Sequence, residues 1–238
     1  MKEIKKVAVL GSGVMGAAIA AHLANCGIPS IMLDIVAPGL SEADAANKKK
    51  RNATAEGAKA ALLKAKPSPI YRQSVLDLIE VGNFDDDMSK ISGCDWIVEV
   101  VKEDLRIKKI VFANAAKHYT PGTIISSNTS GIPIKAMAAD LPDAMSENFL
   151  GTHFFNPPRY LHLMELIPGE ETGDAILSSV AQFAERRLGK GVVRCKDTPN
   201  FIGNRIGCFF GATVTYVNQD DVELFTLTQQ IASVLNCV

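Results

Sequence analysis

The stretch VAVLGSGVMG at residues 7–16 decides the fold of this chain, because an apolar run ends abruptly in glycines. The three glycines Gly11, Gly13 and Gly16 have the spacing G-x-G-x-x-G. The first permits a tight strand-to-helix turn, the second lets a pyrophosphate approach the backbone, and the third lets the helix pack closely on the strand. An apolar strand that leads into such a turn predicts a dinucleotide-binding unit.

The residues after the turn supply the other parts of that unit. Residues 14–25 are rich in alanine and predict a helix whose first amide groups face the phosphates, and Gly27 is placed to end it. Residues 31–33 predict a second apolar strand that delivers Asp34, where a carboxylate accepts hydrogen bonds from an adenosine ribose and repels a 2′-phosphate. A glycine turn without a ligand is the alternative, but the strand before it, the helix after it and the acidic residue together favour a bound dinucleotide. The acidic residue favours NAD over NADP. The expected cofactor-binding residues of this unit are Gly11, Gly13, Val14, Met15, Gly16 and Asp34.

The composition is that of an ordinary globular chain. Of its 238 residues, 47% are hydrophobic and 21% charged, and the formal net charge is −1. This balance provides no broad electrostatic surface, so we expect no nucleic-acid or membrane partner. The five scattered cysteines lack C-x-x-C spacing and predict reduced thiols, with neither a disulfide framework nor a metal site. No segment has the pattern of a targeting peptide or a membrane span, and we expect a cytoplasmic protein.

Apolar segments typical of buried parallel strands alternate with helical segments along the chain. This alternation predicts a doubly wound α/β sheet. Two shorter strands with a helix between them, at 172–187, predict an antiparallel edge. The predicted strands are 7–10, 31–33, 96–101, 123–126 and 150–155 in the main sheet, and 161–167 and 191–193 at the edge.

Two further features indicate the domain organisation. A polar insertion at about 41–88, rich in alanine and lysine and broken by prolines, predicts a helical hairpin. Thr198 can cap a helix and Pro199 suits its first turn, so we divide the chain into a nucleotide-binding domain at 1–197 and the beginning of a helical domain at 198–238. Near the end, apolar residues at helical spacing form a stripe at Leu224, Leu227, Ile231 and Leu235.

Three polar segments fall where such a sheet places its ligands, outside the carboxyl ends of the strands. They are SSNTSG at 126–131, GTHFFNP at 151–157 and DTPNFIGNR at 197–205. Within them His153 is a candidate general base, because a neutral imidazole can accept a hydroxyl proton near pH 7. Glu165 would orient the imidazole if the strands that carry the two residues meet. A buried structural histidine and an exposed strand glutamate are the alternatives, and the spacing leaves both open.

The motifs GSGVMG with Asp34, SSNTSG, GTHFFNP and KDTPNFIGNR, in this order, resemble the (S)-3-hydroxyacyl-CoA dehydrogenase family over about residues 4–210. The segments HFFNPPRY and KDTPNFIGNRIG are most similar in sequence to bacterial fatty-acid oxidation proteins in which this dehydrogenase precedes an enoyl-CoA hydratase domain. The resemblance implies a Rossmann-like NAD-binding domain, a helical insertion involved in CoA binding, and an all-helical C-terminal domain that dimerises. It also implies oxidation of (S)-3-hydroxyacyl-CoA to 3-oxoacyl-CoA with NAD.

The resemblance further implies roles for single residues, with His153 as the base and Glu165 as its orienting partner. Ser130 and Asn204 would hydrogen-bond the substrate's 3-oxygen, and Asn156 would support the loop of His153. Capping or solvated surface positions are the alternatives for Ser130, Asn204 and the charged residues of this set. The implied catalytic residues are His153, Glu165, Ser130 and Asn204; the added NAD contacts are Glu103, Lys108 and Asn128; the substrate contacts are Ser130, Asn156, Asn204 and Lys64, with Lys66 also facing CoA phosphates.

The chain departs from the family pattern in two places. Lys102, Glu103 and Asp104 stand where the family usually has Val-Glu-Asn, and the helical domain would be truncated at Val238. We expect a homodimer if that domain is complete. A catalytically impaired NAD-binding structural or regulatory protein of the same family is the alternative function. A hydroxyacid dehydrogenase without CoA is a third option, and the HFFNP and DTPNF segments argue against it.

Overall fold

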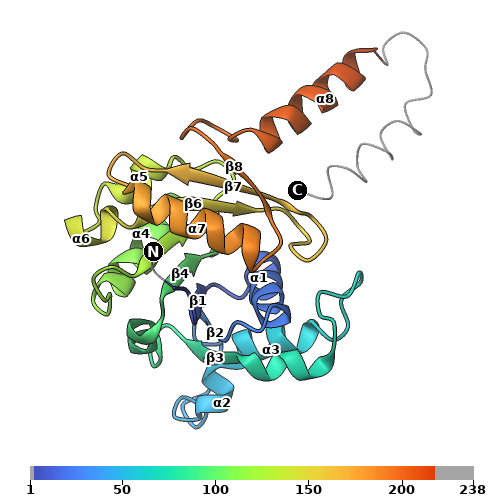
Figure 1. The fold of residues 1–238 in the computed structure, drawn as a ribbon. Helices are drawn as coiled ribbons and strands as arrows, with labels where there is room; N and C mark the ends of the chain where they lie inside the picture. Colours follow the sequence, from blue (N-terminus) through green and yellow to red (C-terminus); the bar gives the residue numbers. More distant parts are fainter. Residues whose placement is uncertain (1–2, 218–238) are drawn as a thin grey trace.

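The computed structural model describes residues 3–217, and its centre is an eight-stranded sheet of order β3-β2-β1-β4-β5-β6-β7-β8 (Figure 1). Strands β1 to β6 pair in parallel, β7 runs antiparallel to β6, and β8 runs parallel to β7. The predicted parallel sheet and its antiparallel edge are therefore confirmed. The strands are β1 (Val7–Leu10), β2 (Ser30–Asp34), β3 (Ile79–Asn83), β4 (Trp96–Glu99), β5 (Ile124–Ser127), β6 (Phe149–Phe154), β7 (Leu163–Pro168) and β8 (Gly191–Arg194).

Helices cover both faces of the sheet, as the doubly wound prediction requires (Figure 1). Successive residues of a strand point to opposite faces, and so β1 contributes Val7 and Val9 to one hydrophobic core and Ala8 and Leu10 to the other. The first core is covered by α1 (Val14–Asn25), α3 (Ala53–Ala61) and α7 (Asp174–Arg186), and the second by α4 (Leu105–Ala116), α5 (Ile134–Ala138) and α6 (Asp143–Ser146).

The glycine turn between β1 and α1 shows the steric reasons for its sequence. Gly11 has a φ of +111°, and a Cβ there would lie 2.7 Å from the carbonyl oxygen of Val100. A Cβ at Gly16 would lie only 1.9 Å from the carbonyl oxygen of Gly11, so helix and strand are in direct backbone contact. A Cβ at Gly13 would meet nothing within 4 Å. The helix ends as predicted, with Gly27 at a φ of +74°.

The structure corrects the predicted helical hairpin at 41–88. The first part holds α2 (Lys48–Arg51) and α3, but a 3-10 turn η1 (Gln73–Leu78) and the strand β3 follow in place of a second helical arm. Strand β3 pairs in parallel with β2 at the edge of the sheet, and a second 3-10 turn, η2 (Met88–Gly93), follows it. An edge strand with the sequence IEVGN has too few apolar residues to give a strand pattern.

The segment after the sheet begins its helix later than predicted. Asn200 and Phe201 have φ values of 61° and 47°, so the chain turns sharply after Thr198 before α8 (Gly203–Val217) begins. Helix α8 projects away from the sheet and its covering helices (Figure 1). The predicted apolar stripe at 224–235 lies outside the described residues, and the division at 197/198 stays a prediction.

The described residues also bear on the predicted thiols and on membrane association. Cys26, Cys94, Cys195 and Cys208 are free thiols, whereas Cys237 lies outside the described residues. Among residues 3–217, no helix combines the length and the apolar character needed to cross a membrane, and no cluster of side chains suits a metal ion.

The packing of the turn predicts different results for two glycine substitutions. Gly16→Ala forces a methyl group into the backbone of Gly11, and we expect the free energy of unfolding to fall by about 3 kcal/mol. Gly13→Ala places the same methyl group in open space, and we expect a loss below about 1 kcal/mol. Urea unfolding of both variants measures the difference. Equal losses at the two positions would contradict the packing argument.

Candidate active site

A buried hydrogen-bonded pair, His153 and Glu165, lies at the centre of the candidate site. Strand β6 places His153 directly opposite Glu165 of the antiparallel strand β7. The Nδ1 atom of His153 lies 2.8 Å from Oε2 of Glu165, and both side chains are almost fully buried. The two strands therefore meet, as an orienting role of Glu165 requires. Glu165 is buried, so it is not the exposed strand residue that was its alternative.

The beginning of α8 holds the other carboxylate oxygen of Glu165. Its Oε1 atom accepts hydrogen bonds from the backbone amides of Ile202, at 3.0 Å, and Gly203, at 2.7 Å. Burial alone raises the pKa of Glu165, but the hydrogen bond from His153 and these two amides together hold the pKa below its usual range. The ionised carboxylate can only accept, so Nδ1 of His153 carries a proton and Nε2 is the free basic nitrogen.

Ser130 occupies the basic side of the imidazole. Its Oγ atom lies 3.2 Å from Nε2 of His153, in the loop that follows β5. The imidazole also contacts the rings of Phe155 and Phe201, whose centroids lie 4.5 and 5.7 Å away. These two aromatic residues were missed by the sequence reasoning, although both stand inside motifs that it singled out.

The nucleotide end of the site is built by Asp34 and the glycine turn. The Oδ2 atom of Asp34 accepts hydrogen bonds from the amide and the hydroxyl of Ser12, at 2.5 and 2.6 Å. The carboxylate is thereby fixed beside the turn. Open space at Gly13 and the exposed side chain of Val14 leave the first turn of α1 accessible, and the residues thus fit a dinucleotide. The side chain of Met15, in contrast, is partly buried and packs against the core.

Glu103 and Lys108 do not form the solvated helix face that was their alternative. Oε1 of Glu103 accepts hydrogen bonds from Thr129 and from the amide of Ser130, and Oε2 lies 3.1 Å from Nζ of the buried Lys108. Burial raises the pKa of Glu103, but Thr129, Lys108 and the Ser130 amide bring it below its usual range. Lys108 also pairs with Glu99 at 2.8 Å.

Glu99 is the polar residue that the sequence reasoning missed in this region. It is the last residue of β4, its exposed fraction is 0%, and burial raises its pKa although Lys108 and Ser127 oppose that shift. The available signal was an acidic residue that ends an otherwise apolar strand, WIVE. Asn128, on the neighbouring strand end, accepts a hydrogen bond from the amide of Phe154 and so braces the strand of His153.

The expected substrate residues lie in two places. Asn156 and Lys66 line a groove of about 540 Å³ between α1 and α3, whereas Lys64 is exposed after α3 and is not part of that lining. Asn204 lies in the first turn of α8, next to Gly203, whose amide binds Glu165. Its Oδ1 atom is buried without a hydrogen-bond partner within the described residues, which marks it as an acceptor still open to a donor.

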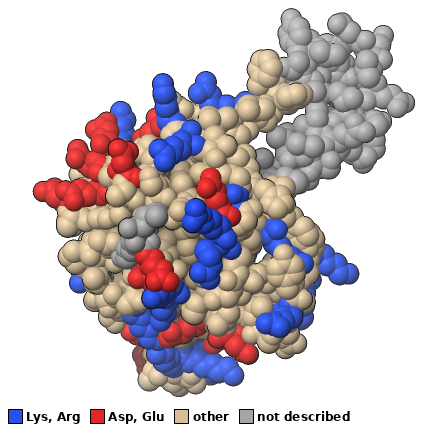
Figure 2. Space-filling view, viewed as in Figure 1, with Lys and Arg blue, Asp and Glu red and all other residues tan. Residues whose placement is uncertain are grey.

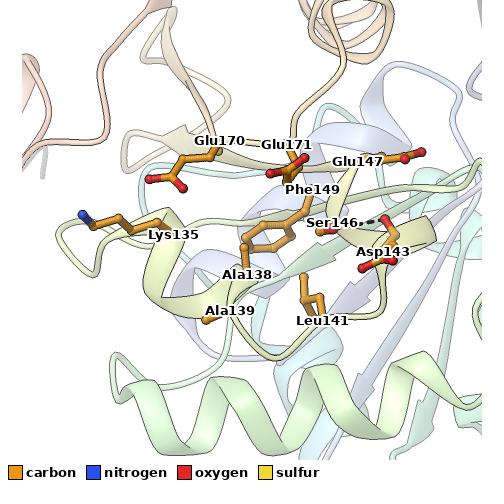
Figure 3. Close-up of a pocket in the computed structure, with 11 residues that line it drawn as sticks. Lys135, Ala138, Ala139, Leu141, Asp143, Ser146, Glu147, Phe149, Glu170 and Glu171 are labelled. Carbon is orange, nitrogen blue, oxygen red and sulfur yellow. Dashed lines mark hydrogen bonds between the residues drawn. The ribbon is translucent and has the colours of Figure 1, made fainter.

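A larger hollow of about 680 Å³ lies at the amino end of β6 (Figure 3). It is bounded by α5, α6 and the turn after β7, and Glu147, Glu170 and Glu171 surround it. Phe149, which also lines it, is the first residue of β6, four residues before His153. The hollow is therefore separate from the site. Elsewhere on the face shown in Figure 2, positive and negative side chains are interspersed.

The hydrogen bonds of Glu165 predict a pH-dependent contribution to stability. A carboxyl group with a lowered pKa in the folded state stabilises the fold above its unfolded pKa, and this contribution is lost as the pH falls through the folded value. From about pH 5 to pH 3, we expect Glu165→Gln to lose less free energy of unfolding than the unmodified chain. Urea unfolding at several pH values tests this, with Glu170→Gln as the exposed control. A parallel loss in the Glu165 variant and the unmodified chain would contradict it.

Comparisons with known proteins identify relatives of this chain. The chain is 49% identical over 220 residues to a probable 3-hydroxyacyl-CoA dehydrogenase of Bacillus subtilis, which covers 90% of this chain and 28% of that relative. It is 44% identical over 207 residues to one of Deinococcus radiodurans, covering 87% of the chain and 58% of the relative. The chain thus spans less than two thirds of these relatives.

Solved structures give the same result. M. tuberculosis FadB2 superposes with a TM-score of 0.74 at 28% identity, covering 99% of this chain and 79% of that one. The (S)-3-hydroxybutyryl-CoA dehydrogenase of Ralstonia eutropha has a TM-score of 0.68 at 30% identity, covering 87% and 68%. A family model described as the NAD binding domain of 3-hydroxyacyl-CoA dehydrogenase matches residues 6–198. The chain therefore belongs to the 3-hydroxyacyl-CoA dehydrogenase family and carries its NAD-binding domain.

Proposed function

We propose that this chain supplies the NAD-binding and base-bearing part of an enzyme that oxidises (S)-3-hydroxyacyl-CoA to 3-oxoacyl-CoA in fatty-acid oxidation. The buried pair of His153 and Glu165 carries the proposal, because it presents a basic nitrogen at the carboxyl ends of the strands. The names of the relatives support the substrate class, and a Rickettsia felis relative at 42% identity is named a putative fatty acid oxidation complex trifunctional enzyme. We place the reaction in the cytoplasm and the complete protein in a homodimer.

His153 holds the proton that the reaction releases. The Nε2 atom accepts the proton of the substrate's 3-hydroxyl group, and the Glu165 carboxylate stabilises the imidazolium that forms. NAD, when bound, supplies the acceptor for the hydride from C3 of the substrate. The glycine turn and Asp34 hold its adenosine and pyrophosphate, and Glu103, Lys108 and Asn128 belong to the nicotinamide end.

Ser130 and Asn204 orient the substrate's oxygen. Because Oγ of Ser130 lies 3.2 Å from Nε2 of His153, a hydroxyl group that reaches this nitrogen is also within reach of Ser130. The open acceptor of Asn204 lies in the helix turn that anchors Glu165. In the reverse reaction the hydroxyl group of Ser130 and the amide nitrogen of Asn204, which are both hydrogen-bond donors, polarise the carbonyl. Asn156 and Lys66 border the groove for the CoA chain, and Lys64 stands outside it, where a phosphate would approach.

Replacement of the base tests this assignment. We expect His153→Gln to reduce the rate of 3-hydroxybutyryl-CoA oxidation at least about a hundredfold while NAD affinity stays within about twofold. Absorbance of NADH measures the rate, and fluorescence of bound NADH measures the affinity.

Two outcomes would overturn parts of the proposal. Unchanged turnover in His153→Gln would reject His153 as the base. An unmodified chain that binds NADH but produces none with 3-hydroxybutyryl-CoA would favour the impaired NAD-binding protein of the same family. His162→Gln is the matched control, because His162 lies outside the site and its Nδ1 atom pairs with the carbonyl of Gly189.

A further inference from the structure

We propose that Glu99 is a positioning residue of this site: through Lys108 it fixes Glu103, and Glu103 in turn fixes the loop that places Ser130 on His153. The role concerns a residue that no ligand can reach, since the exposed fraction of Glu99 is 0%. The catalytic part of the inference rests on the proposed function of His153. The part that concerns cofactor affinity does not.

The first step concerns the ammonium group of Lys108, whose exposed fraction is 1%. Its Nζ atom lies 2.8 and 3.1 Å from the two carboxylate oxygens of Glu99, 3.1 Å from Glu103 and 3.5 Å from the carbonyl of Val101. An ammonium group has three N–H donors, and four oxygen atoms of these three residues surround it. Lys108 therefore acts inside the protein, as a clamp between two carboxylates, and its influence on a bound cofactor passes through Glu103.

The second step concerns the counter-charge that makes this clamp possible. A buried lysine keeps its charge only when it is paired, since burial of an isolated charge is costly. Glu99 supplies that pair, and its carboxylate is itself held by the amide of Val101 at 2.7 Å and the hydroxyl of Ser127 at 2.5 Å. These donors fix both carboxylate oxygens, so Lys108 is anchored to the rigid ends of β4 and β5.

The third step follows Glu103 to the base. One oxygen of Glu103 binds Lys108, and the other accepts from Thr129 Oγ1 at 2.5 Å and from the amides of Ser130 and Gly131 at 3.0 and 3.3 Å. The side chain of Glu103 is about half exposed, so it has little packing to hold it without Lys108. Loss of the clamp would release the loop 129–131, and with it the hydroxyl of Ser130 that faces His153.

The same segment also borders the glycine turn. Val100 follows Glu99 in the chain. Its carbonyl oxygen would lie only 2.7 Å from a Cβ placed on Gly11. The clamp therefore lies between the turn that binds the pyrophosphate and the loop that carries Ser130. A displacement of Glu103 is expected to affect cofactor affinity and turnover together, because small shifts in a catalytic constellation have large effects on rate.

The competing explanation is that Glu99 and Lys108 merely stabilise the fold, and paired substitutions separate the two. Glu99→Gln alone leaves the buried Lys108 short of a counter-charge and destabilises the chain under either explanation. Glu99→Gln with Lys108→Met removes both charges at similar volume, so we expect the melting temperature to recover most of that loss. Lys109→Met is the matched control, since it makes the same change on the same helix in a lysine that pairs instead with Asp140.

The decisive measurement is NADH affinity by fluorescence, with turnover measured alongside. We expect the Glu99→Gln, Lys108→Met double variant to bind NADH about tenfold more weakly than the unmodified chain, and Lys109→Met to bind it normally. We expect Glu103→Gln to show a similar loss, and its addition to the double variant to cause little further loss, because the residues act in one series. Turnover of 3-hydroxybutyryl-CoA should fall in the same variants.

Full recovery of NADH affinity together with the melting temperature would overturn the proposal, as would additive losses in the triple variant. If the double variant does not fold, Glu99→Asp carries the test, because it keeps the charge but shortens the side chain; normal NADH affinity in that variant would equally overturn the proposal. An unmodified chain without turnover would reject the proposed function, and the affinity measurements would still decide the role of Glu99.

Discussion

The hydrogen bond between His153 and Glu165 depends on one reversal in an otherwise parallel sheet. Strands β1 to β6 run in the same direction, and only the antiparallel return of β7 brings a residue twelve positions later directly opposite His153. The second oxygen of Glu165 then binds the amides at the start of α8. The strand reversal, the imidazole and the first helix beyond the sheet therefore form one unit, and the position of α8 is coupled to the orientation of the imidazole.

A second constraint is that backbone segments meet in direct contact around the glycine turn. Gly16 touches the carbonyl of Gly11, and Gly11 in turn faces the carbonyl of Val100 at the end of β4. These contacts leave no room for a side chain at Gly11 or Gly16, so the position of the turn depends on the position of the strand ends. The end of β4 is therefore in direct contact with the glycine turn.

The sequence predicted the parts of the structure that depend on strong local signals. Strand β1 and helix α1 have the predicted bounds, because an apolar run, a glycine turn and an alanine-rich segment each specify their own conformation. Strand β3 was missed because an edge strand needs little apolar sequence, and α8 starts late because Asn200 and Phe201 take left-handed conformations that their residue types do not announce. The meeting of His153 and Glu165 could be stated only conditionally, since sequence spacing does not give strand pairing.

The burial of Lys108 could not be predicted for a related reason. On a helix that begins beside charged residues, a lysine is normally solvated, and only tertiary structure reveals that two carboxylates from different segments converge on it. The three carboxylates Glu99, Glu103 and Glu165 are each held by several donors, although the side chain of Glu103 is about half exposed. Backbone amides, hydroxyl groups and one buried cation hold these carboxylates, so their positions are set by the fold itself.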